Sequence, residues 1–305
     1  MIYIRYERAL LIYNGNAGQK DIKQALGVSV PILSSGISNL MIIQTQRINH
    51  AKELCQLYGP DVDLVIILGG DGTIHECVNG LSKLDHRPMI GILPAGTCND
   101  FSRTLNVDQD IAIAAEQIIN GESIPVDVLK VDEQFCLNFW GTGLIAETSN
   151  NIKQTQKEHF GKISYLLSAI RTMKNMDPFK YTLDIDGERM QGEALLIFIA
   201  NGNYLGTNMM PFKAISYNDG VADVFIIKHT NLTLLKELFT TDITIQNNEL
   251  SQEMNHYSGK SISIYTEAEM DADMDGEVYT KTPSHITVLK HHLYMIKPNE
   301  KREFY

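Results

Sequence analysis

The feature that most constrains the fold is an alternation of short apolar runs with helical patterns over the first 125 residues. Four of these runs have the length and composition of buried strands: Ala9–Tyr13, Leu40–Thr45, Leu64–Leu68 and Met89–Leu93. Between the runs, apolar residues recur at helical spacing: Ile48, Ala51, Leu54, Cys55 and Tyr58; Ile74, Cys77, Val78 and Leu81; Ile111, Ala114, Ala115, Ile118 and Ile119. Such alternation predicts a parallel sheet with helices on both faces, where ligands bind beyond the carboxyl ends of the strands.

The pattern changes after Pro125 to runs with strand-like periodicity. These runs are Val126–Val131, Gln134–Phe139, Tyr181–Asp186, Gly192–Ala200, Val221–Ile227, Lys260–Tyr265 and His285–Lys290. Asp186-Gly187 predicts a hairpin turn, Phe160–Met176 predicts a helix, and Asn231–Ser258 indicates a helix followed by a polar loop. We therefore expect an α/β domain over residues 1–124 and a mainly antiparallel β domain over residues 125–293. A tail, residues 294–305, is expected to pack back on the first domain.

Charge and composition narrow the classes of function. The chain has 305 residues, and 26 Lys and Arg against 37 Asp and Glu give a net charge of −11, which argues against a nucleic-acid binder. No apolar run approaches the ~20 residues of a spanning helix, and charged residues near the N-terminus make a poor signal peptide. The four cysteines form no C-x-x-C pair, so free thiols in a cytoplasmic protein are the simplest interpretation.

A glycine-rich turn follows the third apolar run. Gly69-Gly70-Asp71-Gly72-Thr73 leads directly into the second helical pattern. Glycines allow backbone N–H groups to approach an anion, and the helix that follows offers its positive end. A carboxylate beside phosphates is repulsive unless a divalent cation lies between them, so Asp71 indicates a nucleotide delivered with Mg²⁺. The alternative is a tight strand–helix turn with Thr73 as helix cap, but three glycines and a carboxylate exceed what such a turn needs.

A second loop, Pro94 to Arg103, follows the next strand at the same end of the sheet. Its small residues suit a nucleotide, and Asp100 is a candidate to join Asp71 around a metal ion. Arg103 is a candidate for a phosphate contact or for an exposed salt bridge. The Walker, protein-kinase and Rossmann signatures are all missing from the sequence.

An acidic segment lies late in the chain. Carboxylates occupy every second position there: Glu267, Glu269, Asp271, Asp273, Asp275 and Glu277. Period two predicts one strand with all of these carboxylates on one face, ending at the Asp275-Gly276-Glu277 turn. Three interpretations remain: the start of an EF-hand loop, although Thr282 stands where its last ligand belongs; a solvated acidic face; or a turn that supplies the general base of a kinase.

Taken together, these motifs resemble the diacylglycerol kinase catalytic-domain family, and in particular its bacterial lipid kinases. Gly69–Thr73 matches the family's G-G-D-G-T, and the second loop matches its P-x-G-T-x-N-D-F. The resemblance implies an α/β nucleotide-binding lobe, with a parallel sheet and helices on both faces, plus a mainly antiparallel β-sandwich lobe that takes the lipid substrate. One departure is visible: the family's first loop is usually N-P-x-x-G, and this chain has Asn14-Gly15-Asn16-Ala17-Gly18.

The resemblance also implies roles for individual residues. Glu277 is expected to be the general base, with Asp275 beside it, and Asp71 would join Asp100 and Asp127 in the network around the catalytic Mg²⁺. A second, structural Mg²⁺ would be held by Asp219 with the backbone of Ser216 and Val221, for which a plain hairpin turn is the alternative. The residues implied to contact ATP are Asn14, Gly15, Asn16, Ala17, Gly18, Thr45, Gly69, Gly70, Asp71, Gly72, Thr73, Ile74, His75, Glu76 and Thr97.

The expected function is therefore that of an ATP- and Mg²⁺-dependent lipid kinase, with diacylglycerol as the first expected acceptor and phosphatidic acid as its product. An NAD kinase-like nucleotide kinase and a non-catalytic nucleotide-binding regulatory protein are the alternatives. We expect a cytoplasmic protein that contacts the membrane surface peripherally, aided by basic residues: Lys153, Lys157, Lys162, Arg171 and Lys174. A homodimer is left open, as are the acceptor hydroxyl and the acyl-chain preference.

Overall fold

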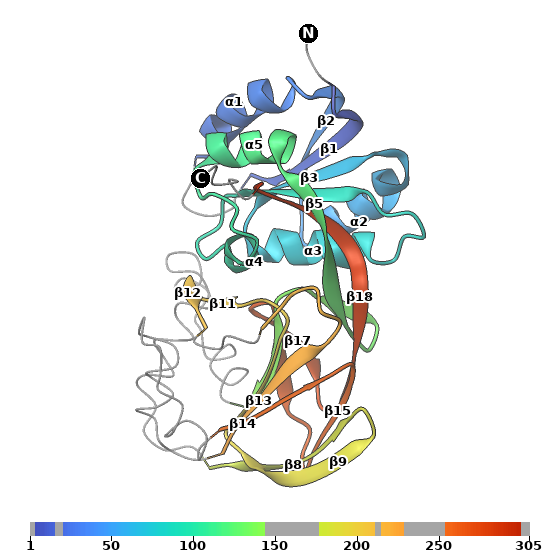
Figure 1. Ribbon diagram of the computed structural model, residues 1–305, viewed down its shortest axis with the longest axis vertical. Coiled ribbons are helices and arrows are strands. Elements are labelled where there is room, and N and C mark those ends of the chain that lie inside the picture. Colours follow the sequence, from blue (N-terminus) through green and yellow to red (C-terminus); the bar gives the residue numbers. More distant parts are fainter. Residues whose placement is uncertain (1–3, 16–20, 144–176, 211–214, 229–253, 300–305) are drawn as a thin grey trace, which may run out of the picture. The chain divides into compact units, whose positions relative to one another are not determined.

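The computed structural model describes residues 4–15, 21–143, 177–210, 215–228 and 254–299, with the side chains of 277–279 excepted (Figure 1). The chain forms two compact units, Met1–Val126 with His291–Tyr305 (unit 1) and Asp127–Lys290 (unit 2). Two strands, β5 (Glu122–Val131) and β18 (Ser284–Lys297), contribute residues to both units. The domain limits expected at 124/125 and 293/294 stay predictions.

Unit 1 is built on a parallel sheet, as predicted. Its strands lie in the order β2 (Ile37–Thr45), β1 (Tyr6–Asn14), β3 (Leu64–Gly69) and β4 (Met89–Pro94), and every neighbouring pair is parallel. Beyond β4, Met295 at the end of β18 pairs with Ile90. All residues of β3 are buried, because this strand lies in the interior of the sheet and both of its faces are covered.

Helices cover the two faces of this sheet. They are α1 (Ile22–Leu33), α2 (His50–Tyr58), the 3₁₀ turn η1 (Gly59–Asp61), α3 (Asp71–Leu81), α4 (Asp100–Thr104) and α5 (Ile111–Asn120). Helix α1 packs with α5 and α2 packs with α3, and Figure 1 shows one pair on each face. One expectation was wrong: Ile48 precedes α2 and is 83% exposed, so it is not part of the apolar stripe. None of the described helices combines the length and apolarity that a membrane crossing needs.

Unit 2 contains two antiparallel layers. One is the sheet β14 (Met254–Gly259), β13 (Ala222–Ile227), β10 (Leu196–Ala200), β7 (Phe139–Gly143), β16 (Asp271–Met274) and β17 (Glu277–Lys281). The other runs from β18 through β15 (Ser261–Thr266) and β8 (Phe179–Ile185) to β9 (Glu188–Ala194), with β5 pairing both β18 and β6 (Gln134–Cys136). A small ribbon joins β11 (Tyr204–Leu205) to β12 (Asn208–Met209). This arrangement confirms the predicted antiparallel lobe.

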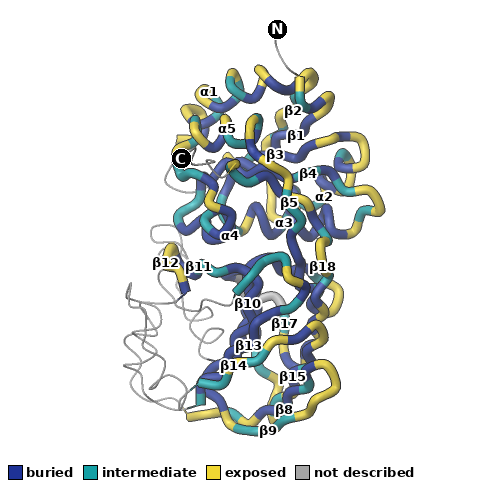
Figure 2. The backbone as a smooth tube through the Cα atoms, viewed as in Figure 1, coloured by how far each residue is buried: buried dark blue, intermediate teal, exposed yellow. Residues whose placement is uncertain are grey.

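Apolar side chains from both layers form the core of unit 2. Leu183, Ile262 and Ile286 come from one layer, and Trp140 and Val224 come from the other. Figure 2 shows the central strands β10 and β13 buried along their length, which explains why their residues are apolar. The exception is Asp223 in β13, whose Oδ1 lies 2.7 Å from Nε2 of His256. The hairpin predicted at Asp186-Gly187 is confirmed: both residues have positive φ, 52° and 91°, as a type I′ turn between β8 and β9 requires.

Two predicted strands are divided between the layers. The run Gly192–Ala200 consists of the end of β9 and the whole of β10, because the chain crosses over at Leu195, whose N–H bonds the carbonyl of Ile227. The run Gln134–Phe139 likewise separates into β6 and the start of β7. Residues 254–258, expected in a polar loop, lie in β14. The helix predicted at 160–176 lies outside the described residues.

The single acidic strand was also a wrong prediction. Strand β15 ends at Thr266 and β16 begins at Asp271, so residues 267–270 connect the two layers. Within β16, Asp273 is completely buried, and Asp275 after it is 8% exposed, whereas Glu267 and Glu269 are exposed. The carboxylates therefore do not share one solvated face, and the two buried ones need hydrogen-bond donors from the protein.

Candidate active site

The carboxyl ends of the unit 1 strands carry several of the predicted site residues. In β1 and β2, Asn14 lies in register with Thr45, and in β3 and β4, Gly69 lies in register with Pro94. Because all four strands are parallel, these ends share one edge of the sheet, the usual place for a ligand in such a fold. The predicted residues Asn16, Ala17 and Gly18 lie outside the described residues.

The two glycine loops at this edge are in close contact. A Cβ atom added to Gly96 would lie 2.4 Å from the Cα of Gly70, and one added to Gly70 would lie 2.8 Å from the Cα of Gly96. The N–H of Ala95 also donates to the carbonyl of Gly69 at 2.9 Å. Glycine is therefore required at both positions because the backbones touch, in addition to any ligand approach.

Asp71 joins these loops through its carboxylate. Its Oδ2 accepts the N–H of Asn99 at 2.9 Å and its Oδ1 accepts the N–H of Asp100 at 2.8 Å, at the start of α4. Asn99 has a positive φ of 54°, and its own Oδ1 accepts the N–H of Gly96 at 2.8 Å. The Asp71 carboxylate therefore lies at the backbone of Asp100, and a metal ion shared by the two carboxylates stays a prediction. The residue that caps α3 is Gly70, not Thr73, which lies inside the first turn.

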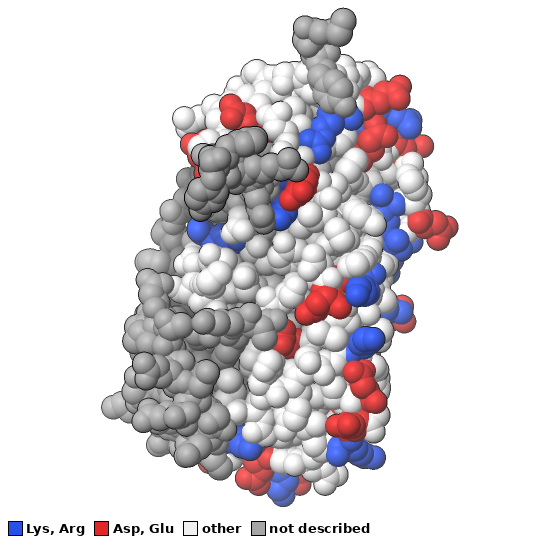
Figure 3. Space-filling model, in the orientation of Figure 1, with Lys and Arg blue, Asp and Glu red and all other residues white. Residues whose placement is uncertain are grey.

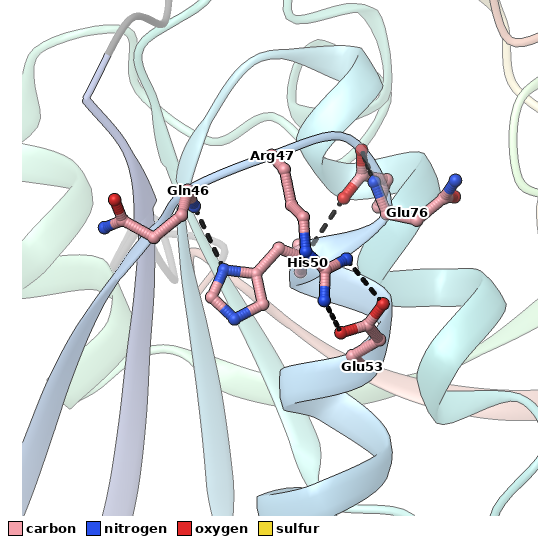
Figure 4. A network of polar contacts seen from close by, with 7 residues as sticks. Gln46, Arg47, His50, Glu53 and Glu76 are labelled. Carbon is pink, nitrogen blue, oxygen red and sulfur yellow. Dashed lines mark hydrogen bonds and ion pairs between the residues drawn. The ribbon is translucent and has the colours of Figure 1, made fainter.

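The side chains that follow in α3 make contacts within unit 1. Ile74 is 2% exposed, and His75 is buried with its Nε2 3.1 Å from Nδ2 of Asn79. The carboxylate of Glu76 accepts the N–H groups of Asn49 at 2.9 Å and Ala51 at 3.1 Å, so it caps the start of α2 (Figure 4). The start of α3 offers an anionic ligand its backbone N–H groups beside Asp71.

The segment after Thr45 is ordered by its own polar contacts (Figure 4). The N–H of Gln46 donates to Nδ1 of His50 at 3.0 Å, and Arg47 makes a bidentate contact with Glu53 at 2.7 and 2.6 Å. This hydrogen bond from Arg47 lowers the pKa of the exposed Glu53 carboxyl. The path of residues 46–50 is therefore fixed by hydrogen bonds within this segment and to the first turns of α2.

In unit 2, the acidic turn is tied to a distant segment. Asp275 Oδ1 accepts the N–H groups of Asn138 at 2.8 Å and Phe139 at 3.1 Å, and Oδ2 accepts that of Leu137 at 3.0 Å. The thiol of Cys136 donates to Oδ1 at 3.2 Å. Burial, followed by the negative charge of Asp275, raises the pKa of this thiol, so it stays protonated.

Asp275 and Gly276 have positive φ angles of 53° and 95° and form the turn between β16 and β17. Glu277 is the first residue of β17, with its backbone paired to Met274. Its side chain is outside the described part of the structure, so its role as a base stays a prediction. The carboxylate of Asp275 serves backbone donors, which fits a structural task better than a direct proton transfer.

Asp127 is tied to the predicted second metal loop. Its N–H donates to the carbonyl of Tyr217 at 2.7 Å, and its Oδ2 accepts the N–H of Gly220 at 2.6 Å. In that loop, the exposed Asp219 accepts the N–H of Val221 at 3.1 Å, and Ser216 Oγ lies 3.1 Å from Asn218 Oδ1. Gly220 has a φ of 89°, and the loop leads into β13, whose partners among the described strands are β10 and β14. Both interpretations of this loop stay predictions.

Two asparagines in these networks were missed as functional residues when the sequence was considered alone. The backbone N–H of Asn138 donates to the Asp275 carboxylate, and the buried Asn201 donates from Nδ2 to the carbonyls of Asp127 and Leu137. For Asn201 a signal existed: the polar tripeptide Asn201-Gly202-Asn203 follows directly after the fully apolar β10.

Whether the predicted residues could hold a metal ion depends on the donor atoms that they present. Within the described ranges, no three His, Cys, Asp or Glu side chains gather as a metal cluster. The EF-hand interpretation is wrong, because strands flank the segment, Asp275 binds backbone N–H groups and Asp273 accepts the N–H of Gly276 at 2.8 Å. Asp71 and Asp100 carry the carboxylate oxygens that a hard cation prefers, and the Asp71 carboxylate lies at the backbone N–H of Asp100. Each carboxylate oxygen can accept more than one bond.

A surface groove of about 570 Å³ lies on β8, β9 and β15. Lys180, Tyr181, Gly192 and Tyr265 are among its lining residues, and none of the predicted site residues belongs to it. The predicted site residues therefore lie outside this groove.

Comparison with known proteins agrees with the two-part architecture. Residues 8–131 match the diacylglycerol kinase catalytic domain, and residues 141–297 match the YegS C-terminal NAD kinase beta sandwich-like domain. A Staphylococcus aureus (strain Mu3) protein named "Putative lipid kinase" is 36% identical over 97% of this chain and 99% of its own.

Solved structures show the same relationship. A crystal structure described as "a putative diacylglycerol kinase" from Bacillus anthracis has a TM-score of 0.88 at 42% identity, and covers 96% of this chain and 97% of the other. A second, described as a diacylglycerol kinase from the same organism, has a TM-score of 0.86 at 41% identity, with 96% and 97% covered. The chain therefore belongs to the diacylglycerol kinase catalytic-domain family, and it is a kinase.

Proposed function

We propose that this kinase is an ATP- and Mg²⁺-dependent lipid kinase that phosphorylates a hydroxyl group of a membrane lipid. Diacylglycerol is the first proposed acceptor, with phosphatidic acid as product. Family membership and the names of the relatives support the reaction class. The observation that carries the proposal is the Asp71 carboxylate, which joins the glycine-rich turn to Asp100 at the carboxyl edge of a parallel sheet.

Phosphoryl transfer depends mainly on positioning and on stabilisation of charge. The glycine loops and the backbone N–H groups at the start of α3 bind and orient the phosphates. Asp71 and Asp100 would hold Mg²⁺, with Asp127 as the proposed further member of the network; when bound, the ion offsets the charge that develops on the transferred group. Glu277 accepts the proton of the lipid hydroxyl. Asp275 holds the turn from which β17, and with it Glu277, begins.

The proposal is tested by incubating the protein with labelled ATP and total membrane lipids and by identifying the labelled product. Purified diacylglycerol, sphingosine, ceramide and NAD then form a panel of acceptors. Labelled phosphatidic acid supports the proposal. Labelling of NAD alone would replace it with the nucleotide kinase alternative, which is included because residues 141–297 match an NAD kinase beta sandwich-like domain. Nucleotide binding without any labelled product would indicate a regulatory protein.

The general base is tested by Glu277→Gln. Loss of a positioned base lowers turnover by about 10²–10⁴-fold, with nucleotide affinity retained. Glu267→Gln is the matched control, because Glu267 is an exposed carboxylate of the same acidic segment that pairs with Lys180 at 3.7 Å. Near-normal turnover of Glu277→Gln, or equal losses in both variants, would remove Glu277 from the mechanism.

Access to a lipid acceptor requires contact with a membrane surface, and we propose that this contact is peripheral and on the cytoplasmic side. On the face shown in Figure 3, acidic and basic side chains are interspersed among the described residues. The basic residues expected to help lie between 153 and 174, outside the described residues. Sedimentation with anionic and neutral vesicles at low and high salt tests this point, and identical binding to both would refute an electrostatic contribution.

A further inference from the structure

The side chain of Asn201 makes a connection that the sequence did not reveal. Asn201 follows β10 and is 1% exposed. Its Nδ2 donates both hydrogens, to the carbonyl of Leu137 at 2.7 Å and to the carbonyl of Asp127 at 3.0 Å. Its Oδ1 has no hydrogen-bond partner among the described residues, so the side-chain amide is held entirely through its two N–H donors.

On one side of Asn201 lies the segment that supports the acidic turn. The backbone N–H groups of Asn201 and Gly202 both donate to the carbonyl of Asn138 at 2.9 Å. The N–H groups of the same segment, 137–139, point to the carboxylate of Asp275. Segment 137–139 is therefore held on its carbonyl side by Asn201 and on its N–H side by Asp275.

On the other side of Asn201 lies Asp127. Beyond the carbonyl that Asn201 binds, Asp127 is fixed to the 217–220 loop through its N–H and its carboxylate. One buried amide group therefore bridges the segment that holds the acidic turn and a strand that carries a proposed member of the metal network. Both bonds require N–H donors, so an aspartate of the same shape cannot replace this asparagine.

Strand pairing alone does not fix the position of the turn. The register between β16 and β17 shifts at Ala272 and Asp273, just before the turn begins. Such an irregularity changes the direction of the strand and leaves the turn dependent on other contacts. Besides the pairing of β16 with β7 and β17, the turn is held through segment 137–139. The N–H groups of this segment donate to the Asp275 carboxylate, and its Phe139 carbonyl accepts the N–H of Asp275 at 3.2 Å. Asn201 binds the carbonyl of Leu137 in the same segment.

We infer that Asn201 is a positioning residue of this kinase, which sets the acidic turn 275–277 relative to Asp127. The inference rests on the proposed function, because the turn carries the proposed base. Asn201 belongs to unit 2, and its side chain donates to Asp127 and Leu137 of the same unit. Its loss should therefore lower kcat and leave nucleotide affinity unchanged, since misplacing a reacting group by about 1 Å can cost about 10²-fold in rate.

The test compares Asn201→Asp and Asn201→Ala with two controls in the same unit. Asn255→Ala removes an amide that donates to Tyr257 at 3.3 Å outside this network, and Ile264→Val trims a fully buried core side chain. All variants are assayed well below their midpoint of thermal unfolding. We expect kcat to fall at least tenfold in both Asn201 variants and less than twofold in the controls, with the Kd for ATP within twofold of wild type in all of them.

Hydrogen exchange provides a readout that does not depend on the acceptor lipid. Peptides that cover 137–139 and 275–278 should exchange faster in both Asn201 variants and at the wild-type rate in Asn255→Ala. Unchanged exchange in these peptides overturns the inference, as does a fall in kcat that Ile264→Val reproduces. If the wild type phosphorylates no lipid, the proposed function fails, and the exchange result alone then decides whether Asn201 positions the turn.

Discussion

Replacing Asp275 tests whether a buried carboxylate, in addition to strand pairing, holds the acidic turn in place. The carboxylate accepts backbone N–H groups from Leu137, Asn138 and Phe139 at 3.0, 2.8 and 3.1 Å, and the residue is 8% exposed. Asp275→Ala leaves these three donors without their acceptor. A buried unsatisfied group costs about 1–3 kcal/mol, and the positive φ of 53° adds about 1 kcal/mol for alanine.

Water that enters the vacated space recovers part of this loss, so we expect Asp275→Ala to lower the free energy of unfolding of unit 2 by about 3–5 kcal/mol. Asp275→Asn keeps one acceptor oxygen and tolerates a positive φ, so about 1–2 kcal/mol is expected. Asp275→Gly also removes the carboxylate, but glycine adopts the positive φ without strain. This variant should therefore be more stable than the alanine variant by about 1 kcal/mol.

The assay is urea denaturation followed by tryptophan fluorescence. Trp140 is the only tryptophan of the chain, and it is fully buried in β7 of unit 2, so its emission reports the unfolding of that unit. Asp184→Ala is the control, because Asp184 accepts a single backbone N–H, from Gly187 at 3.0 Å, beside another hairpin turn. If Asp275→Ala and Asp184→Ala destabilise the unit equally, the reasoning about Asp275 is refuted.

Two further predictions concern unit 1. Gly96→Ala forces a Cβ to within 2.4 Å of the Gly70 Cα, so the melting temperature and the nucleotide affinity of this variant should both fall. Gly72→Ala is the control: a Cβ at Gly72 has no atom within 4 Å, so this variant should melt at or above the wild-type temperature. Equal melting temperatures of the two variants would contradict the close approach of the loops. Burial, and after it the positive charge of Arg87, lowers the pKa of His292 below its ordinary value of 6.5, so the folded state favours the neutral imidazole. The contribution of His292 to the free energy of unfolding is therefore fully present above pH 6.5 and is lost as the pH falls below 6.5. Wild type should therefore exceed His292→Gln in stability by more at pH 7.5 than at pH 5.5, and a constant difference in thermal melts would refute this assignment.

The architecture of unit 1 and its principal loops could be predicted because their signals are local. A fully buried run such as Leu64–Leu68, followed by Gly69–Thr73 and a helical stripe, specifies a strand, a turn and a helix within about 20 residues of sequence. The same reasoning failed at residues 267–277. Period two cannot show that the residues before β16 leave one layer to enter the other, nor that the register of β16 shifts at Ala272 and Asp273.

What the sequence determined by itself was the parallel sheet, the glycine-rich turn beside Asp71, and the antiparallel character of the later chain. Only the tertiary structure decided which layer each later strand joins, and where the backbone of segment 137–139 finds its acceptors. The physical reason is range: Asp275 lies 138 positions from Leu137, whose N–H it accepts, and no local periodicity records a bond between residues so far apart. Buried backbone groups must nevertheless form hydrogen bonds. In the folded chain, Asp275 accepts the N–H of Leu137 and Asn201 donates to the carbonyl of the same residue.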